Sequence, residues 1–594
     1  MRTNRFHIYL VVIFIAGMVI RLIPLAEYAL VGDDLGRYIH QVDALLENGV
    51  FSYSFPGWAS TEAEFVGFYG LFGILVALFG TSTAETLSIA PLFSLIAIAM
   101  VILLTLKIFR NEKIALLAGA FLAVSPLFTL ISSRPVKAVL GFPIFGLCLL
   151  ALYLSYRDKR GLSILYMSTL ALVLTHNLTT YFLIIGVLSI SFFREISRKS
   201  NDWEKLRIEL PYLAYLLISA LTFTFVISKE FGRSFLSSIQ TVLPIPAWSL
   251  FILGLAFLAS LPILVRIRRA GRFRGIIKLA NALRIKKEKG LKRSLMAFGI
   301  MASMAIIFLY IPLPIGLEYS LNPLQLIWII PSALSISFAL AGQLHCKGDE
   351  KLFVYLTIAP IISLAIGLVT QVSFLYPYRH ADYIVMPGFV LVGVALTRVK
   401  VKRKKLLKYG TIALLVVCGL VAYPPSPVRS YDEGFTDGEV NAIRWIMTSE
   451  IRPEDVVAAD LGESGLIFGL AKHENVTWNE AYWIFVAESY NESCRCEVEN
   501  QNISYVFVSS QMWRSGIVAK SGRTETSIGD YAIPGGAALV KFFDEPFDLV
   551  YTNYNEYFDF SSDDLREHML NDETGELDIR NLPRDSVWIF KVNL

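Results

Sequence analysis

Residues 87–113 read LSIAPLFSLIAIAMVILLTLKIFRNEK, an apolar run that ends in a short basic segment. An apolar run of about 20 residues is long enough to cross a bilayer as an α-helix. Lys and Arg concentrate in cytoplasmic loops, so the basic end predicts which side of the membrane the helix reaches. The same alternation of apolar runs and basic connections recurs over residues 1–425, which predicts a polytopic α-helical membrane domain.

The composition of the whole chain agrees with this class. Of its 594 residues, 55% are hydrophobic and only 18% are charged. Soluble domains carry roughly 25% charged residues, so the composition excludes a soluble cytosolic enzyme, a disordered chain and a nucleic-acid binder. We therefore expect membrane lipids among its partners and no nucleic acid.

The apolar runs predict about thirteen membrane spans, several of them short. These spans cover residues 7–24, 87–106, 114–131, 138–156, 162–175, 178–193, 208–227, 248–265, 294–313, 324–342, 352–370, 383–398 and 410–422. One further apolar run, residues 65–79, is ambiguous. If it does not span, the basic connections all fall on one side, so we interpret it as a re-entrant or surface-lying helix. The N-terminus is then cytoplasmic and the C-terminus extracytoplasmic.

The charge of the chain separates it into two parts. From Tyr431 to the end there are 30 acidic and 12 basic residues, whereas the first 430 residues carry 42 basic and 20 acidic ones. Short stretches in residues 430–594 alternate between helix-like and strand-like patterns, which is typical of a mixed α/β module. We expect a soluble extracytoplasmic domain there.

The first outer loop contains two adjacent acids, Asp33 and Asp34. Apolar residues recur after them at helical spacing, so both acids lie at the N-terminal end of an amphipathic helix. One hypothesis is that they only cap this helix and favour its dipole. The other is that two neighbouring carboxylates beside the membrane provide a general base or a metal ligand. The residues alone leave both open.

This region resembles the first outer loop of the GT-C glycosyltransferases. The resemblance comes from an acid followed by the pair Arg37 and Tyr38, and from a helix that ends in Glu-Asn-Gly at residues 47–49. Residues 67–73 (GFYGLFG) and 122–126 (LAVSP) are also similar to the family. By spacing, Asp34 rather than Asp33 stands at the position of the family's catalytic aspartate.

The resemblance implies a membrane enzyme that takes a sugar from a polyprenyl-phosphate carrier. The predicted arrangement is that of oligosaccharyltransferase catalytic subunits, but two of their motifs are missing. The second outer loop, residues 132–137 (SSRPVK), has no carboxylate, and residues 461–465 (LGESG) stand where their WWDYG signature is expected. We therefore favour the branch that transfers from monophosphate-linked sugars to a hydroxyl of a glycan, lipid or protein of the cell envelope. There one aspartate is the base, no cofactor is required, and the sugar's anomeric configuration inverts.

Several residues near the outer ends of spans are candidates for substrate binding. Arg379 resembles the family's phosphate-contacting arginine, and a guanidinium is suited to a developing phosphate charge. The other candidates are Arg134, Lys137, His176 and Tyr38. The alternative is that the basic residues are interfacial charges of the kind common at span ends. Glu318, together with Asp34, is a candidate site for Mg²⁺ or Mn²⁺, which prefer oxygen ligands.

Two hypotheses from other classes stay open. A lipid-linked glycan flippase or other transporter predicts ionisable groups inside the bundle, and these are sparse, with Arg21 as the main exception. A catalytically silent scaffold predicts that Asp33 and Asp34 are buried in helix-capping hydrogen bonds with no cavity beside them.

Overall fold

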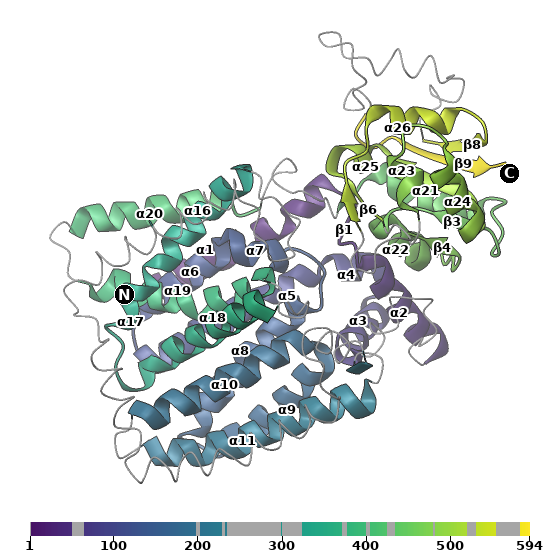
Figure 1. Cartoon of the computed structure of the whole chain (residues 1–594). Coiled ribbons are helices and arrows are strands. Elements are labelled where there is room, and N and C mark those ends of the chain that lie inside the picture. Colours follow the sequence, from purple (N-terminus) through teal and green to yellow (C-terminus); the bar gives the residue numbers. More distant parts are fainter. Residues whose placement is uncertain are drawn as a thin grey trace.

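The fold consists of a long helical bundle with a smaller α/β domain at one end (Figure 1). The computed structural model describes residues 2–49, 65–197, 202–228, 232–233, 299, 323–370, 377–399, 404–423, 434–478, 481–519, 530–553 and 583–593. Within these ranges, the prediction of a polytopic helical membrane protein with a C-terminal α/β domain is confirmed.

The bundle is built from long apolar helices that run back and forth between its two ends (Figure 1). Its first half comprises α1 (Arg2–Glu27), α5 (Phe93–Phe109), α6 (Glu112–Val124), α7 (Pro126–Ser132), α8 (Ala138–Ser155), α9 (Arg160–Thr175), α10 (Asn177–Ser197), α11 (Asp202–Thr222) and the π-helix η4 (Phe223–Ile227). Its second half comprises α16 (Pro323–Ser337), α17 (Ala339–Gln343), η6 (Gly348–Lys351), α18 (Leu352–Thr370), η8 (Pro377–His380), α19 (Ala381–Arg398) and α20 (Lys404–Leu420).

Seven helices in the described part of the chain are long and apolar enough to cross a membrane, or eight if the bent pair α6 and α7 is one span. Four shorter apolar helices of the bundle region fall below that length: Val66–Phe79, Arg160–Thr175, Ile330–Gln343 and Leu407–Leu420. The predicted spans 248–265 and 294–313 lie outside the described residues. The count of thirteen therefore stays a prediction.

The predicted span at residues 114–131 is not a single straight helix. It divides into α6 and α7, which meet at an angle of 60°. Pro126 begins α7 and has no N–H to donate to α6. The guanidinium of Arg21, which is fully buried, donates to the carbonyl of Ala123 at 3.1 Å and so satisfies one of the carbonyls that the bend leaves open. This intramembrane charge thus has a structural partner at the bend.

The segment between the first two spans forms a layer between the bundle and the α/β domain. It comprises β1 (Leu30–Val31), α2 (Leu35–Asn48), α3 (Val66–Phe79), α4 (Thr83–Ser88) and η3 (Ala90–Leu92). Helix α2 ends at Gly49, whose φ of 69° is a left-handed conformation that glycine adopts without strain. Helix α3 packs on α2 and α9 and is 14 residues long. This helix is shorter than the roughly 20 residues that a span needs, and the interpretation that residues 65–79 do not span stays a prediction.

The C-terminal domain is a mixed sheet flanked by helices. Its strands are β3 (Val456–Ala458), β4 (Val476–Thr477), β5 (Ile503–Ser509), β8 (Phe547–Thr552) and β9 (Val587–Val592), in the order β4-β3-β5-β9-β8. The first three strands are parallel and the last two antiparallel to their neighbours. Further elements are β2 (Gly434–Phe435), α21 (Asp437–Thr448), α22 (Leu461–Leu470), α23 (Tyr482–Val486), α24 (Glu492–Gln501), α25 (Ser510–Ser515), β6 (Ile517–Ala519), β7 (Asp530–Ala532), α26 (Gly536–Val540) and η10 (Lys541–Phe543).

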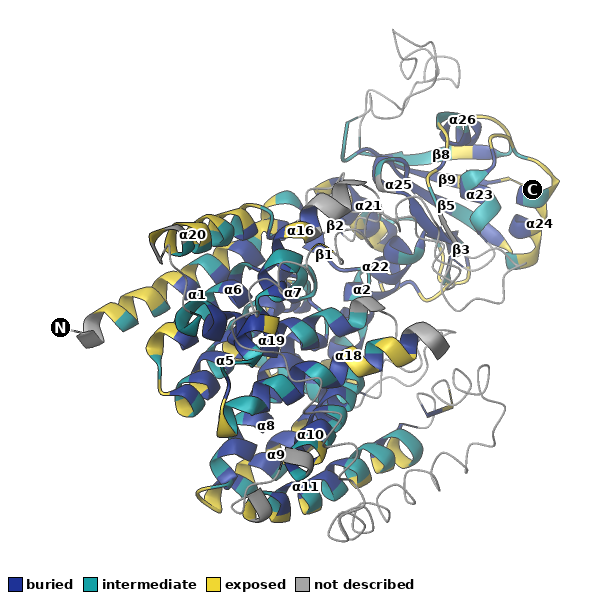
Figure 2. Cartoon of the chain, turned by 60° about the vertical axis from the view of Figure 1, so that its left-hand side comes forward, coloured by how far each residue is buried: buried dark blue, intermediate teal, exposed yellow. Residues whose placement is uncertain are grey.

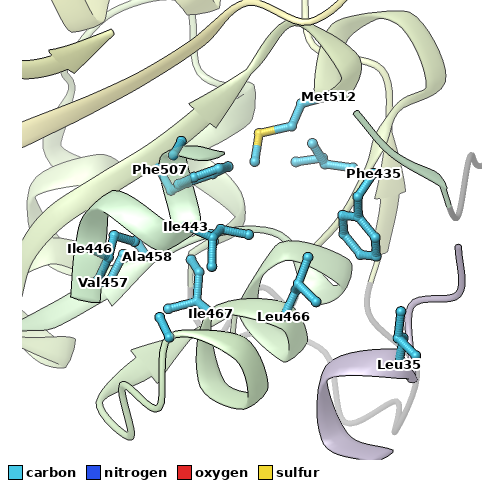
Figure 3. Packing of buried hydrophobic residues seen from close by; sticks show 14 of the residues in the cluster. Leu35, Phe435, Ile443, Ile446, Val457, Ala458, Leu466, Ile467, Phe507 and Met512 are labelled. Atoms are coloured by element: carbon cyan, nitrogen blue, oxygen red, sulfur yellow. The ribbon is translucent and has the colours of Figure 1, made fainter. Parts of the chain in front are cut away.

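The first loop shares its hydrophobic core with the C-terminal domain. One cluster joins Leu35, Tyr38 and Phe72 of the loop to the buried face of the sheet, and a second cluster fills the helical bundle. Figure 3 shows Leu35 of α2 beside Leu466 of α22 and Phe435 of β2. Strand β1 also pairs with β2, so that Leu30 faces Phe435. The N-terminal end of α2 therefore lies where the loop meets the domain.

Helix α2 and helix α22 touch through glycines. A Cβ added to Gly36 would collide with the carbonyl of Gly465, and one added to Gly469 would collide with the carbonyl of Gly36. Glycine permits such backbone contact because it has no side chain. An ion pair joins Lys472, which follows α22, to Glu47 of α2, and another joins Arg584 of the domain to Glu27 at the end of α1, at 3.2 Å. The domain is thus packed directly on the helix that follows Asp34.

The exposed apolar side chains gather on the outside of the bundle. They are prominent on α1 and α20, which are largely yellow in Figure 2. Ion pairs within the bundle join Arg194 to Glu209, Lys205 to Asp349 and Arg398 to Glu350. An apolar outer surface is what a membrane-spanning bundle requires.

Candidate functional site

Asp34 lies at the junction of the bundle, the first loop and the α/β domain. Strand β1 is held by β2, and the chain then turns at Gly32, which has a φ of 106° and lies against Pro135 of the second loop. A residue with a side chain would be strained at this φ and crowded by Pro135. The turn therefore places Asp33 and Asp34 beside the loop that carries Arg134 and Lys137.

The carboxylate of Asp34 is held by two side chains from the first turn of α2. The Nη1 atom of Arg37 lies 2.8 Å from Oδ1, and the hydroxyl of Tyr38 donates to Oδ2 at 3.2 Å. The Asp34 side chain is 32% exposed, whereas that of Arg37 is 9% exposed. These contacts orient a carboxylate that solvent and small molecules still reach.

Asp34 does not cap α2 with its side chain. This residue occupies the N-cap position of α2, but its side chain makes no capping hydrogen bond and its backbone is helical, with φ −82° and ψ −8°. A capping aspartate has an extended backbone and accepts a hydrogen bond from the second or third helical N–H. Asp33 precedes it, with its carbonyl against Gly465, and is partly buried. The scaffold hypothesis requires helix-capping hydrogen bonds at these acids, and Asp34 does not make one.

Lys137 brings a positive charge to the same place. It precedes α8, is only 9% exposed, and its Nζ lies 4.3 Å from the centre of the Phe65 ring and 5.9 Å from that of Tyr38. An ammonium over an aromatic face is attracted by the ring's electrons. Tyr38 thus contacts Asp34 with its hydroxyl and Lys137 with its ring.

His176 and Arg379 complete the group. His176 is the residue between α9 and α10, and Arg379 is in η8, directly before α19. Burial, together with the smaller effect of the positive charges of Lys137 and Arg379, lowers the pKa of His176 to about 3. Both cations therefore lie near enough to act electrostatically on this imidazole, and the imidazole stays neutral at physiological pH. The structure thus links Asp34, Tyr38, Lys137, His176 and Arg379 in one group.

An apolar cavity of about 140 Å³ begins next to this group. It runs between α10, α11 and η4, and includes Asn177 and Thr180, which follow His176 in the first turn of α10. Phe223 lines it and packs on Phe65, the ring that lies under Lys137, with the two ring centres 5.6 Å apart. A positively charged group therefore adjoins an apolar space at the end of the bundle. This combination is suited to a lipid whose head group is anionic.

Two further residues were candidates from the sequence, Arg134 and Glu318. Arg134 is in the same loop as Lys137 and is partly exposed. Glu318 lies outside the described residues, so the proposed site for Mg²⁺ or Mn²⁺ stays untested. Within the ranges that the structure describes, no three His, Cys, Asp or Glu residues are grouped so that they could hold a metal ion.

The sequence interpretation gave no role to three residues that shape the site. Arg37 is the ion-pair partner of Asp34, and the i to i+3 spacing on an expected helix was a signal for it. Phe65 lies under Lys137, and Thr179 binds the ring of His176. No local pattern indicates these last two, because their partners come from other segments.

Comparisons with known proteins give only a distant similarity. No family model matches the chain, and no curated protein matches its sequence. The chain is similar to the crystal structure of ArnT from Cupriavidus metallidurans bound to undecaprenyl phosphate, at 15% identity and a TM-score of 0.37, over 85% of this chain and 93% of that one. The apo structure of the same protein gives 16% identity, a TM-score of 0.34, and 86% and 91% coverage. Because both TM-scores are low, a functional proposal must stand on the site's own geometry.

Proposed function

We propose that the chain is a membrane glycosyltransferase of the GT-C type. It moves a sugar from a polyprenyl-phosphate carrier to a hydroxyl acceptor at the face of the membrane that carries the α/β domain. The observation that carries the proposal is a set of interactions beside an apolar cavity. Tyr38 contacts both the Asp34 carboxylate and Lys137, and the charges of Lys137 and Arg379 act on His176. A base, an anion-binding group and an apolar space for the start of the lipid chain are the three parts that such a transfer requires.

In the proposed reaction, Asp34 is the general base. Its carboxylate accepts the proton of the acceptor hydroxyl while that oxygen attacks the anomeric carbon of the sugar. The bond between the anomeric carbon and the phosphate oxygen breaks, and the polyprenyl phosphate leaves with the electron pair. A single displacement of this kind inverts the anomeric configuration. Arg37 and Tyr38 hold the carboxylate in place, which favours attack from one direction.

The leaving phosphate is stabilised by Lys137 and Arg379. Negative charge develops on the phosphate as the glycosidic bond breaks, and nearby cations stabilise that charge more in the transition state than in the ground state. Lys137 is almost buried and is held by two aromatic rings, so little reorganisation is needed when the charge appears. The first isoprene units of the carrier would occupy the cavity beside Phe223. No metal ion is needed for these steps.

The glycine contact between α2 and α22 weighs against asparagine glycosylation. Residues 461–465 stand where a peptide-reading motif is expected, but the backbone of Gly465 packs on Gly36 and Asp33. This segment therefore supports the helix that follows Asp34, and its backbone is covered by that helix. We favour a hydroxyl acceptor for this reason.

A transfer assay in proteoliposomes tests the proposal. The purified chain is given a radiolabelled polyprenyl-phosphate sugar together with an extract of envelope glycans and lipids, and the loss of label from the carrier is followed. Asp34→Asn should lower transfer at least about 100-fold, because a general base contributes roughly 10²–10⁴ in rate. Asp43→Asn is the matched control: Asp43 is also on α2, and Thr83 donates a hydrogen bond to it that an asparagine oxygen can still accept. Equal activity of Asp34→Asn and Asp43→Asn would exclude Asp34 as the base.

A further inference from the structure

The α9–α10 junction holds the imidazole of His176 in a fixed position. His176 is the one residue between the two helices, with φ −157° and ψ 112°. Its carbonyl accepts hydrogen bonds from the backbone N–H and the hydroxyl of Thr180, at 3.1 and 2.9 Å. Its ring packs over Gly141 of α8, where an added Cβ would lie 3.4 Å from Nδ1. The ring therefore has little freedom to turn.

The hydrogen bonds to the ring determine its tautomer. The backbone N–H of Thr179 donates to Nδ1 of His176 at 3.3 Å. A backbone N–H can only donate, so Nδ1 must carry a lone pair rather than a hydrogen. The hydroxyl of Thr179, 2.6 Å from Nδ1, then also donates to it, and the hydroxyl of Tyr383 donates in turn to Thr179 Oγ1 at 2.5 Å. In a neutral imidazole the hydrogen is consequently on Nε2.

The Nε2 atom is left available for a ligand. Both hydrogen bonds of the ring are at Nδ1, and Nε2 makes none with the residues that the structure describes. Lys137 and Arg379 are close enough to act electrostatically on the ring and to disfavour a third positive charge there. A neutral N–H donor therefore lies within a site that already holds two cations.

We propose that His176 donates a hydrogen bond from Nε2–H to a non-bridging oxygen of the carrier's phosphate. This role rests on the proposed function and assigns to His176 one defined chemical contact. A neutral donor binds an anion directionally, and it adds no repulsion to Lys137 and Arg379 when the site is empty. Thr179 and Tyr383 are positioning residues, because they fix the tautomer and hence which nitrogen carries the hydrogen.

Three substitutions at His176 separate donation from simple packing. A glutamine amide places an N–H donor near the position of Nε2, an asparagine amide places it near Nδ1, and leucine has no donor. Affinity for a polyprenyl monophosphate is measured in nanodiscs by native mass spectrometry, and transfer is measured as above. We expect His176→Leu and His176→Asn to weaken binding and slow transfer about 10- to 100-fold, with His176→Gln within about threefold of the original chain.

The outcomes distinguish this inference from the proposed function. If the unmodified chain neither binds the lipid phosphate nor transfers sugar, the proposed function and this role both fail. If the unmodified chain is active and His176→Leu equals it, only the role of His176 fails. If His176→Gln is as impaired as His176→Leu while the thermal midpoints of both match the original, donation from Nε2 is excluded.

The tautomer has a direct spectroscopic readout. The chain contains seven histidines, so ¹⁵N-histidine labelling followed by comparison with His176→Gln identifies the two ring resonances of His176. We expect the Nδ1 resonance at the shift of an unprotonated ring nitrogen and the Nε2 resonance at that of a protonated one. Addition of a polyprenyl monophosphate should move the Nε2 resonance. A protonated Nδ1 would overturn the assignment whatever the activity of the variants.

Discussion

Replacing Gly36 by alanine tests whether contact between α2 and α22 holds the site in its working geometry. Gly36 is two residues from Asp34, and a Cβ there would lie well inside 3.0 Å of the Gly465 carbonyl, closer than real Cβ atoms approach other atoms. Ordinary contact begins at 3.4 Å, so α2 must move by more than about 1 Å. A misplacement of about 1 Å costs on the order of 100-fold in rate. We expect Gly36→Ala to lower transfer by about that factor while the chain still folds.

The measurement combines the proteoliposome transfer assay with a thermal midpoint in detergent. Gly70→Ala is the matched control, because Gly70 is also helical, in α3, and has no atom within 4 Å of an added Cβ. Gly469→Ala perturbs the same contact from the α22 side and should reproduce the loss seen with Gly36→Ala. Wild-type rates for Gly36→Ala and Gly469→Ala would show that the distance between these helices does not affect the position of Asp34, and the argument for a positioning role of the domain would be wrong.

Three further predictions concern charges in and around the site. Lys137→Met should lower transfer about 10- to 100-fold. The control Lys472→Met breaks a surface ion pair with Glu47 and should change transfer little. Comparable losses in the two variants would contradict a specific role for Lys137. Arg21→Leu removes the hydrogen-bond donor to the Ala123 carbonyl at the bend between α6 and α7. We expect roughly a tenfold loss of transfer with a smaller change in thermal midpoint. Unchanged transfer would refute a role of Arg21 in holding the bend. Below pH 6.5 the unfolded chain binds a proton at His176, whereas the folded chain, in which the pKa of His176 is lowered to about 3, does not. As the pH is lowered from 6.5 toward 3, the stability of the original chain should therefore decrease more steeply than that of His176→Gln. Parallel pH profiles of the two proteins would contradict this.

The sequence was sufficient to predict the class of the molecule and most of its elements. Length and composition of the apolar runs depend only on neighbouring residues, and they placed the long helices correctly. The mixture of helix-like and strand-like patterns after residue 430 predicted an α/β module, and the structure has a mixed sheet with helices there. The bend at Pro126 shows the limit of this approach, because hydropathy alone does not record where a helix changes direction.

The residues that form the site could be proposed from the sequence, but their arrangement could not. Asp34, Tyr38, Lys137, His176 and Arg379 come from four separate connections, and no local pattern specifies the distance between connections. The structure brings them together through long-range packing, in which the sheet pairs with β1 and the glycines of α22 meet Gly36.

The tautomer of His176 illustrates the same division. From the sequence, His176 is predicted to lie between two helices because the residues on both sides of it form apolar runs. Only the folded chain brings the hydroxyl of Tyr383, 204 positions away from Thr179, to within 2.5 Å of that threonine, and so decides which ring nitrogen carries the hydrogen. Local order follows from the chemistry of adjacent residues, whereas the chemistry of a site depends on contacts that close long loops of chain.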